Sequence, residues 1–264
     1  MLTVPRRGAA IVMNSPAGQM AICAALICCA SQAHATEVDT AIVFAVDVYG
    51  SVDPATAYLQ REGHAAAISS QAVLAAINRS RTGCIAITYV EWSSYGQMRS
   101  VIPWTHICGA DDAHTAASAI RNGGNKGLGC ESICQTSLSF AIDGSVTLFR
   151  SYTGNPANKI IDISANGINN DGLPVEQSRL RAIAAGCTIN VIALPYAMPG
   201  IRIDLSQYFA DNVIGGPNAF VMPLASPGVY ASALRQKLVR EISAADPIDE
   251  VLSNPSDPSY SPRL

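Results

Sequence analysis

The stretch AVDVYGSVD at residues 45–53 follows an apolar run and decides how the chain is interpreted. Residues 41–46, AIVFAV, are uninterrupted apolar, which is typical of a strand buried on both faces of a parallel sheet. Asp47 ends this run, and Asp53-Pro54 has the form of a helix start, with an acidic N-cap and proline in the first turn. The stretch therefore predicts a buried strand, a polar loop and a helix.

The rest of the chain alternates the same two patterns. Continuous apolar runs predict further strands at residues 84–92, 97–107, 159–163, 187–194 and 219–224. Helical patterns are expected at residues 55–78 (broken near 69–70), 111–121, 132–149, 174–185, 206–212 and 227–242. The expected fold class is α/β: a doubly wound, mostly parallel sheet with one antiparallel edge strand and helices on both faces.

Two details refine this prediction. Turn residues at 93–96 join the second and third strands as a hairpin, and Pro103 places the third strand at a sheet edge because proline cannot donate to a central ladder. The final helix is expected to bury one face and to expose its cations. The residues expected on the buried face are Ala231, Leu234, Leu238 and Ile242, and those off it are Arg235, Lys237 and Arg240.

Composition and charge limit the classes of function. The 264 residues are 49% apolar and 14% charged, enough for one large core. The formal net charge is −3 and no basic run occurs, so neither nucleic acid nor an anionic membrane is expected as a partner. We expect a signal peptide at 1–35, a folded domain at 36–245 and a disordered Pro/Ser-rich tail at 246–264.

The N-terminal segment has the features of a secretory signal. Arg6 and Arg7 precede the apolar stretch 20–30, and Ala33 and Ala35 form a small-x-small cleavage site. The apolar stretch is shorter than the roughly 20 residues of a membrane span, which argues against an anchor. We therefore expect a periplasmic or secreted protein, with no membrane span after cleavage and a net charge two units lower, at −5.

Cleavage would remove three of the eight cysteines and leave an odd number. The five that remain are Cys84, Cys108, Cys130, Cys134 and Cys187. Cys130 and Cys134 are close enough in sequence to be bridged, whereas Cys84 and Cys187 open apolar runs and are interpreted as buried thiols. The pairing stays open.

In an open α/β sheet, ligands bind at the carboxyl ends of the strands. This places three loops side by side, at residues 47–53, 128–133 and 164–170. Their Asp, Ser and Asn side chains offer oxygen ligands of the kind that Mg²⁺ prefers. The sequence therefore points to a site at this edge of the sheet.

At these loops the chain resembles the von Willebrand factor A (VWA) domain over residues 38–243, and within that family a group of exported bacterial proteins with no assigned function. The segments that carry the resemblance are VDTAIVFAVDVYGSVD, LQREGHAAAI, YVEW, VIPWT, IIDISANGINNDG, AGCTINVIAL, VIGGPNAFV and LRQKLVREI. The resemblance implies adhesion or assembly through a protein partner, and not catalysis.

The family's metal-ion-dependent adhesion site (MIDAS) uses Asp-x-Ser-x-Ser, then a Thr, then an Asp. Carried over by position, the first loop supplies Asp47 and Ser51, but Tyr49 stands where the family has its first Ser. The Thr falls on Ser132, since Thr136 is expected one helical turn too far in. The last Asp falls on Asn166.

The two departures leave one carboxylate, so the resemblance implies a degenerate site that binds Mg²⁺ weakly or not at all. Glu131 could restore a charge. The alternative is that Asp47 and Ser51 cap the first helix. Tyr49 either anchors a partner or fills the vacant metal cavity. Together with Glu131 and with Asn169, which flanks the site, it forms the expected partner-binding set.

The function expected from these observations is an exported binding module, not an enzyme. One alternative is a metal-independent scaffold or decayed paralogue, and another is a phosphatase-like hydrolase that uses Asp47. The second Asp of such an enzyme is Tyr49 here, and no nucleophile elbow or Ser-His-Asp set is evident. His64, Trp92 and Trp104 are interpreted as structural residues.

Overall fold

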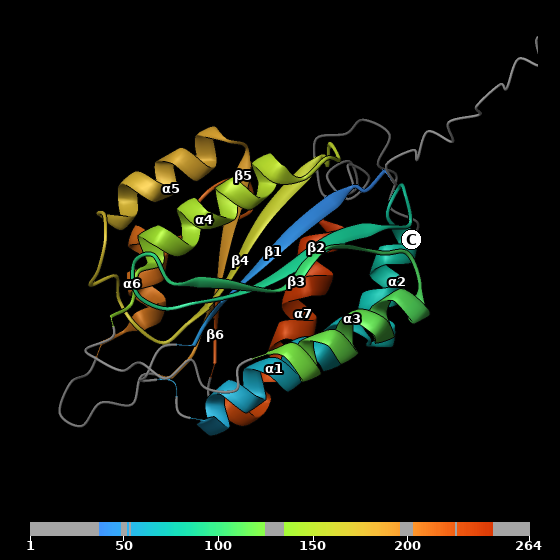
Figure 1. Ribbon diagram of the computed structural model, residues 1–264, viewed down its shortest axis with the longest axis horizontal. Helices are drawn as coiled ribbons and strands as arrows, with labels where there is room; N and C mark the ends of the chain where they lie inside the picture. Colours follow the sequence, from blue (N-terminus) through green and yellow to red (C-terminus); the bar gives the residue numbers. More distant parts are fainter. Residues whose placement is uncertain are drawn as a thin grey trace, which may run out of the picture. The chain divides into compact units, whose positions relative to one another are not determined.

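The computed structural model describes residues 37–48, 52, 54–124, 135–195, 203–224 and 226–244 (Figure 1). Within them the sheet has six strands: β1 Thr40–Asp47, β2 Ile85–Trp92, β3 Met98–Ile107, β4 Asn158–Ala165, β5 Cys187–Ala193 and β6 Val221–Pro223. Their order is β3-β2-β1-β4-β5-β6, and only the β2–β3 pair is antiparallel. The prediction of a mostly parallel sheet with one antiparallel edge strand is confirmed.

The helices of the described residues cover both faces of this sheet (Figure 1). They are α1 Pro54–Ile68, α2 Gln71–Arg79, α3 Ala110–Gly123, α4 Leu138–Ser151, α5 Val175–Ala184, α6 Leu205–Asn212 and α7 Tyr230–Ser243, with a short 3₁₀ turn at Pro227–Val229. Helices α1, α2, α3 and α7 pack on one face, and α4, α5 and α6 on the other. No helix among the described residues is long and apolar enough to cross a membrane.

The alternation of side chains along β1 feeds both cores. Phe44 and its neighbours at even positions join the α7 face, while Val43 and Ala45 at odd positions join the α4 face. Every residue of β1 is buried, as the continuous apolar run predicts. Asp47 continues the odd series, so its side chain lies on the α4 face at the carboxyl end of the strand.

The local stop and start signals act as expected in two places. The predicted break at residues 69–70 separates α1 from α2, and Ser70 Oγ caps α2 by accepting from the amide of Val73 (3.3 Å). Gly186 follows α5 with φ +77°, a conformation that glycine adopts without strain. The helix predicted at 132–149 is partly wrong, because α4 begins only at Leu138.

The largest error concerns α7. Leu234, Leu238 and Ile242 are buried as predicted, but Ala231 is exposed and Lys237, expected at the surface, is fully buried. The inward face of α7 therefore carries a charge in the position where the pattern predicts solvent.

Cysteine pairing also differs from the expectation. Cys84, interpreted as a buried thiol, forms a disulfide with Cys108, which joins the residue before β2 to the residue after β3. Cys187 is a buried free thiol, as predicted. Cys130 and Cys134, the predicted signal peptide and the predicted tail lie outside the described residues, so those predictions stand as they were made.

Candidate functional site

The carboxyl edge of the sheet is built around the end of β1. Asp47, its last residue, is fully buried and lies beside Trp92 in the β1–β2 register. The backbone continues the ladder for one more residue, because Val48 N–H donates to the carbonyl of Trp92 (3.0 Å). Gln60 of α1 donates its Nε2 to the carbonyl of Asp47 (3.0 Å). The strand end is thus fixed from two sides before the polar loop begins.

Two further loops reach the same edge. Asn166 directly follows β4, whose residue Ser164 is paired with Val46, so it lies at the level of the β1 terminus. The next residue, Gly167, packs against the loop before α4: a Cβ atom there would lie 3.0 Å from Thr136 Oγ1. Thr136 and Asn166 are both buried.

The reason for placing the family's Thr on Ser132 does not hold. Thr136 precedes α4 by two residues and lies in the loop, not one turn inside the helix. Its hydroxyl makes no hydrogen bond to another described residue. Thr136 is therefore a hydroxyl of this edge that sequence reasoning set aside. The other first- and second-loop residues predicted for the site, Tyr49, Ser51, Glu131 and Ser132, lie outside the described residues.

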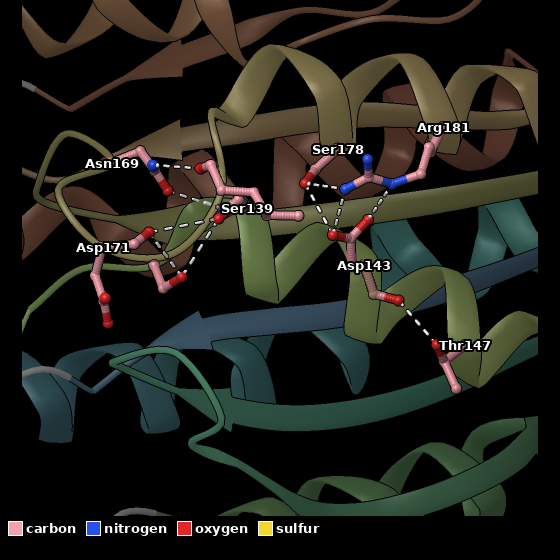
Figure 2. A network of polar contacts seen from close by, with 9 residues as sticks. Ser139, Asp143, Thr147, Asn169, Asp171, Ser178 and Arg181 are labelled. Atoms are coloured by element: carbon pink, nitrogen blue, oxygen red, sulfur yellow. Dashed lines mark hydrogen bonds and ion pairs between the residues drawn. The ribbon is translucent and has the colours of Figure 1, made fainter.

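Residues 169–171, which we call the latch, join the loop after β4 to the start of α4. Figure 2 shows the contacts of Asn169 and Asp171. Asn169 Oδ1 accepts from the amide of Ser139 (2.9 Å), which caps the first turn of α4, and its Nδ2 donates to the carbonyl of Leu173 (3.0 Å). Asn170 Oδ1 accepts from the amide of Thr136 (2.8 Å). The side-chain amide of Asn169, predicted as a partner contact, is thus engaged within the protein.

The latch also holds the hairpin between β2 and β3. Asp171 Oδ2 accepts from the amide of Tyr95 (2.6 Å), and Oδ1 accepts from the amide of Gly172 (2.8 Å). Gly172 has φ +79°, and a Cβ atom there would lie 2.7 Å from Ser137 Oγ. Only glycine fits this close approach between the latch and the start of α4.

Large apolar side chains stay exposed around the latch. Tyr95 is 61% exposed and packs against the ring of Phe140 at 5.2 Å between centroids, and Leu173 is 44% exposed. Their backbones are held by the bonds to Asp171 and Asn169. The hydrogen bonds of residues 169–171 therefore fix the backbone of this edge. The apolar side chains Tyr95, Phe140 and Leu173 lie around it, and we call them the apolar rim.

One helical turn after Ser139, an exposed ion pair joins α4 to α5 (Figure 2). Arg181 donates Nε to Asp143 Oδ1 (3.1 Å) and Nη2 to Oδ2 (2.7 Å), and Ser178 Oγ also donates to Oδ2 (2.9 Å). This bidentate pair links α4 to α5 at the surface.

The fit of these groups to Mg²⁺ can be judged from their chemistry. Asp47, Thr136 and Asn166 supply a carboxylate, a hydroxyl and an amide, all oxygen donors that suit Mg²⁺ in kind. They bring one negative charge, and Asp171 has both oxygens committed to backbone amides. In the part of the chain that the structure describes, no cluster of three or more His, Cys, Asp or Glu residues could hold a metal. This donor set fits weak binding.

A second polar cluster, which the sequence did not reveal, lies under α7 on the other face. Lys237 Nζ is 2.7 Å from Asp162 Oδ1 on β4 and also contacts Glu241 Oε1 one turn along the helix. Asn190 of β5 donates Nδ2 to the same Glu241 oxygen (2.7 Å). Burial and the neighbouring Glu241 carboxylate raise the pKa of Asp162 well above its usual value, which favours the protonated acid.

His64 completes this cluster nearer the carboxyl edge. Its Nδ1 lies 2.8 Å from the carbonyl of Gln60 and 3.4 Å from the hydroxyl of Tyr230, which is itself hydrogen-bonded to Ser164. Burial lowers the pKa of His64 from 6.5 to about 3, and the charge of Lys237 acts in the same direction. The ring is therefore neutral near pH 7, in line with the structural role predicted for it.

The strand order and the two helix layers are those of a VWA-type α/β fold. Solved structures of that type match with low identity. A pilus adhesin, SpaC, from Lactobacillus rhamnosus GG is 11% identical over 77% of this chain and 30% of its own, with a TM-score of 0.56. Proximal thread matrix protein 1 from the mussel byssus is 15% identical over 79% of this chain and 48% of its own, with a TM-score of 0.57.

A further structure of the same byssus protein, described with a zinc-occupied MIDAS motif, is 14% identical with a TM-score of 0.58, over 78% of this chain and 48% of its own. At these identities the likeness shows the fold alone, and this chain spans less than half of either protein. No curated protein matches the chain. By its sequence the chain belongs to the family described as "Protein of unknown function (DUF1194)", whose model matches residues 37–246.

Proposed function

We propose that this chain is an exported, non-catalytic binding module that recognises a protein partner through the carboxyl edge of its sheet. The observation that carries the proposal is the apolar rim. Tyr95 and Leu173 stay exposed although the backbone on both sides is fixed by Asp171 and Asn169. A pre-organised exposed aromatic loses little entropy on binding, which is why such residues dominate protein interfaces.

Two observations support export. The Cys84–Cys108 disulfide is of the kind that persists in oxidising compartments. The predicted signal sequence at residues 1–35 has the same implication. We therefore propose a periplasmic or secreted location, where the rim would meet other envelope or extracellular proteins. The adhesin and byssus matrix proteins that share the fold are consistent with such a role.

The partner can be sought by photo-crosslinking in cells of the source organism. A photoreactive phenylalanine analogue replaces Tyr95 in one variant and Tyr58 in the control. Tyr58 lies on α1 and is 53% exposed, so the two positions have similar accessibility. We expect a discrete crosslinked product from position 95 only. Equal products from both positions, or none from position 95, would contradict the proposal.

We further propose that Mg²⁺ contributes little to this recognition, because Asp47 is the one carboxylate that the carried-over site retains. Titration calorimetry of the mature chain with Mg²⁺ and Mn²⁺ tests this point. No saturable heat is expected below about 1 mM ion, since one carboxylate gives a hard cation little to replace its hydration. A Tyr49→Ser/Asn166→Asp variant restores the family's ligands and is expected to bind. Saturable micromolar binding by the wild type would instead make the edge a working metal site.

A further inference from the structure

A pocket of about 140 Å³ opens at the opposite, amino edge of the sheet. It lies between the first residues of β4 and β5, the loop before β6 and the last turn of α7. Its charged side chains are Lys159, Arg240 and Glu241, and Asn158, Asn190 and Phe220 lie beside them. Because liquid water occupies roughly 30 Å³ per molecule, the volume corresponds to about five waters, or to one small organic molecule.

The wall formed by residues 215–218 is held rigidly. Ile189 N–H donates to the carbonyl of Gly215 (2.7 Å), and Thr188 Oγ1 donates to the carbonyl of Pro217 (3.2 Å). Gly216 has φ +92°, and a Cβ atom there would lie 2.6 Å from the carbonyl oxygen of Cys187. Asn218 has φ +57°, unusual for a residue with a side chain. Such backbone strain occurs often at ligand sites.

The pocket contains a carboxylate, Glu241, with one oxygen that receives no hydrogen bond from a described residue. Glu241 is 3% exposed, and both described donors to its side chain, Lys237 and Asn190, reach the same oxygen, Oε1. The other oxygen, Oε2, is buried and has no hydrogen-bond partner among the described residues. A buried carboxylate oxygen without a donor is costly. A donor group on a bound molecule would complete it.

The pocket also has a cation that lacks a carboxylate. The guanidinium of Arg240 stacks on the ring of Phe220, with its central carbon 3.8 Å from the ring centroid. It makes no ion pair with a described residue, unlike Arg99, Arg121 and Arg181. Stacking fixes the plane of the guanidinium and leaves its N–H edge able to bind a carboxylate.

We infer that this pocket binds a small carboxylic acid that carries a hydroxyl or ammonium group beside the carboxylate. The carboxylate pairs with Arg240, and the neighbouring donor reaches Glu241. The charges agree with a carboxylate as ligand: Lys159 and Arg240 both line the pocket, and Glu241, the one carboxylate among the lining residues, is already paired with Lys237. The pocket is a second site, on the edge away from the proposed protein interface.

Titration of the whole mature chain, followed by NMR and calorimetry, tests the inference. The probes are lactate and glycerate for a hydroxyl donor, glycine and serine for an ammonium donor, and propionate as a carboxylate without a donor. We expect saturable binding of at least one donor-bearing acid, stronger than that of propionate. Amide shifts should be concentrated at residues 188–190, 218–220 and 240–244.

Two variants of α7 complete the test. Arg240→Gln should weaken binding about tenfold or more, the value of a charge-assisted hydrogen bond. Arg235→Gln, also exposed on α7 but outside this pocket, should leave it unchanged. The inference is overturned if no donor-bearing acid binds, if propionate binds equally well, or if both variants bind as the wild type does.

Discussion

The two faces of the sheet hold their helices by the same chemistry in opposite surroundings. On the α7 face, Lys237 and Glu241 form an ion pair with no exposed surface on either side chain. On the α4 face, Arg181 and Asp143 form an ion pair that is 46% and 32% exposed. The charged atoms lie at similar distances, 2.5 Å in the buried pair and 2.7 Å in the exposed pair. The two pairs differ in their exposure to solvent, and therefore in the free energy that is lost when one partner is removed.

This contrast separates specificity from stability. A buried pair gains little over apolar residues of similar size, because desolvation offsets the attraction, but breaking it leaves a buried charge. An exposed pair gains little and also costs little to lose. The cluster under α7 therefore fixes where the helix lies, whereas the pair between α4 and α5 adjusts a packing that apolar residues already determine.

The largest effect is expected from Lys237→Met, which leaves Glu241 as an uncompensated buried carboxylate. The free energy of unfolding should fall by about 3–5 kcal/mol, measured by urea denaturation. The double variant Lys237→Met/Glu241→Gln should recover more than half of this loss, because no charge then lacks a partner. A single variant that loses less than about 1 kcal/mol would show that the pair is not desolvated.

The next effect is a dependence on pH that originates at His64. Its folded pKa, about 3, lies below the 6.5 of the unfolded chain, so below pH 6.5 the unfolded chain alone binds the proton. Stability should therefore fall by roughly 2–3 kcal/mol between pH 7 and pH 4.5 through this residue. Asp162, whose pKa is raised, acts in the opposite direction. Comparing the pH dependence of wild type and His64→Gln isolates the histidine, and identical slopes would refute its role.

A smaller effect is expected at the latch of the carboxyl edge. Asn169→Ala removes the acceptor for the amide of Ser139 and should lower the free energy of unfolding by about 1 kcal/mol, the usual value of a helix cap. Amide exchange at Ser139 and Tyr95 should accelerate. Asn212→Ala removes a side-chain bond to the carbonyl of Tyr208 on α6 and serves as the control, with no change at those amides. An equal change in both variants would mean that the latch does not hold the rim.

The smallest effect belongs to the exposed pair. Arg181→Ala should lower the free energy of unfolding by no more than about 1 kcal/mol, and less in 1 M salt, where screening is nearly complete. A loss approaching that of Lys237→Met would remove the distinction drawn between the two faces.

The sequence predicted what short-range patterns determine. Continuous apolar runs located β1, β2 and β5, and the serines at 69–70 located the break before α2. The sequence-based prediction failed where residues far apart in the chain determine the local structure. The start of α4 depends on Asn169, thirty residues later, and the partner of Cys84 is Cys108, across a hairpin. Lys237 was assigned to solvent because of its charge, although it shares the spacing of Tyr230, Leu234 and Glu241 on the inner face.

The sequence indicated where the candidate site lies but not which residues surround it. Topology places the ends of β1 and β4 at one edge, and the family resemblance assigned Asp47 and Asn166 to that edge. Thr136 was rejected because the helix start was misplaced by six residues. The rim could not be predicted, because Tyr95 and Leu173 lie in turns far apart in the sequence. The hydrogen bond from the amide of Tyr95 to Asp171 brings these turns together.

The edge strand β3 has a consequence for how partners can attach. Pro103 removes one amide from it, and the disulfide closes the hairpin at the end away from its turn. The opposite edge, β6, is only three residues long. Both borders of the described sheet are therefore poor templates for another strand. At a crowded interface this architecture disfavours polymerisation through the backbone and leaves side chains to determine which assemblies form.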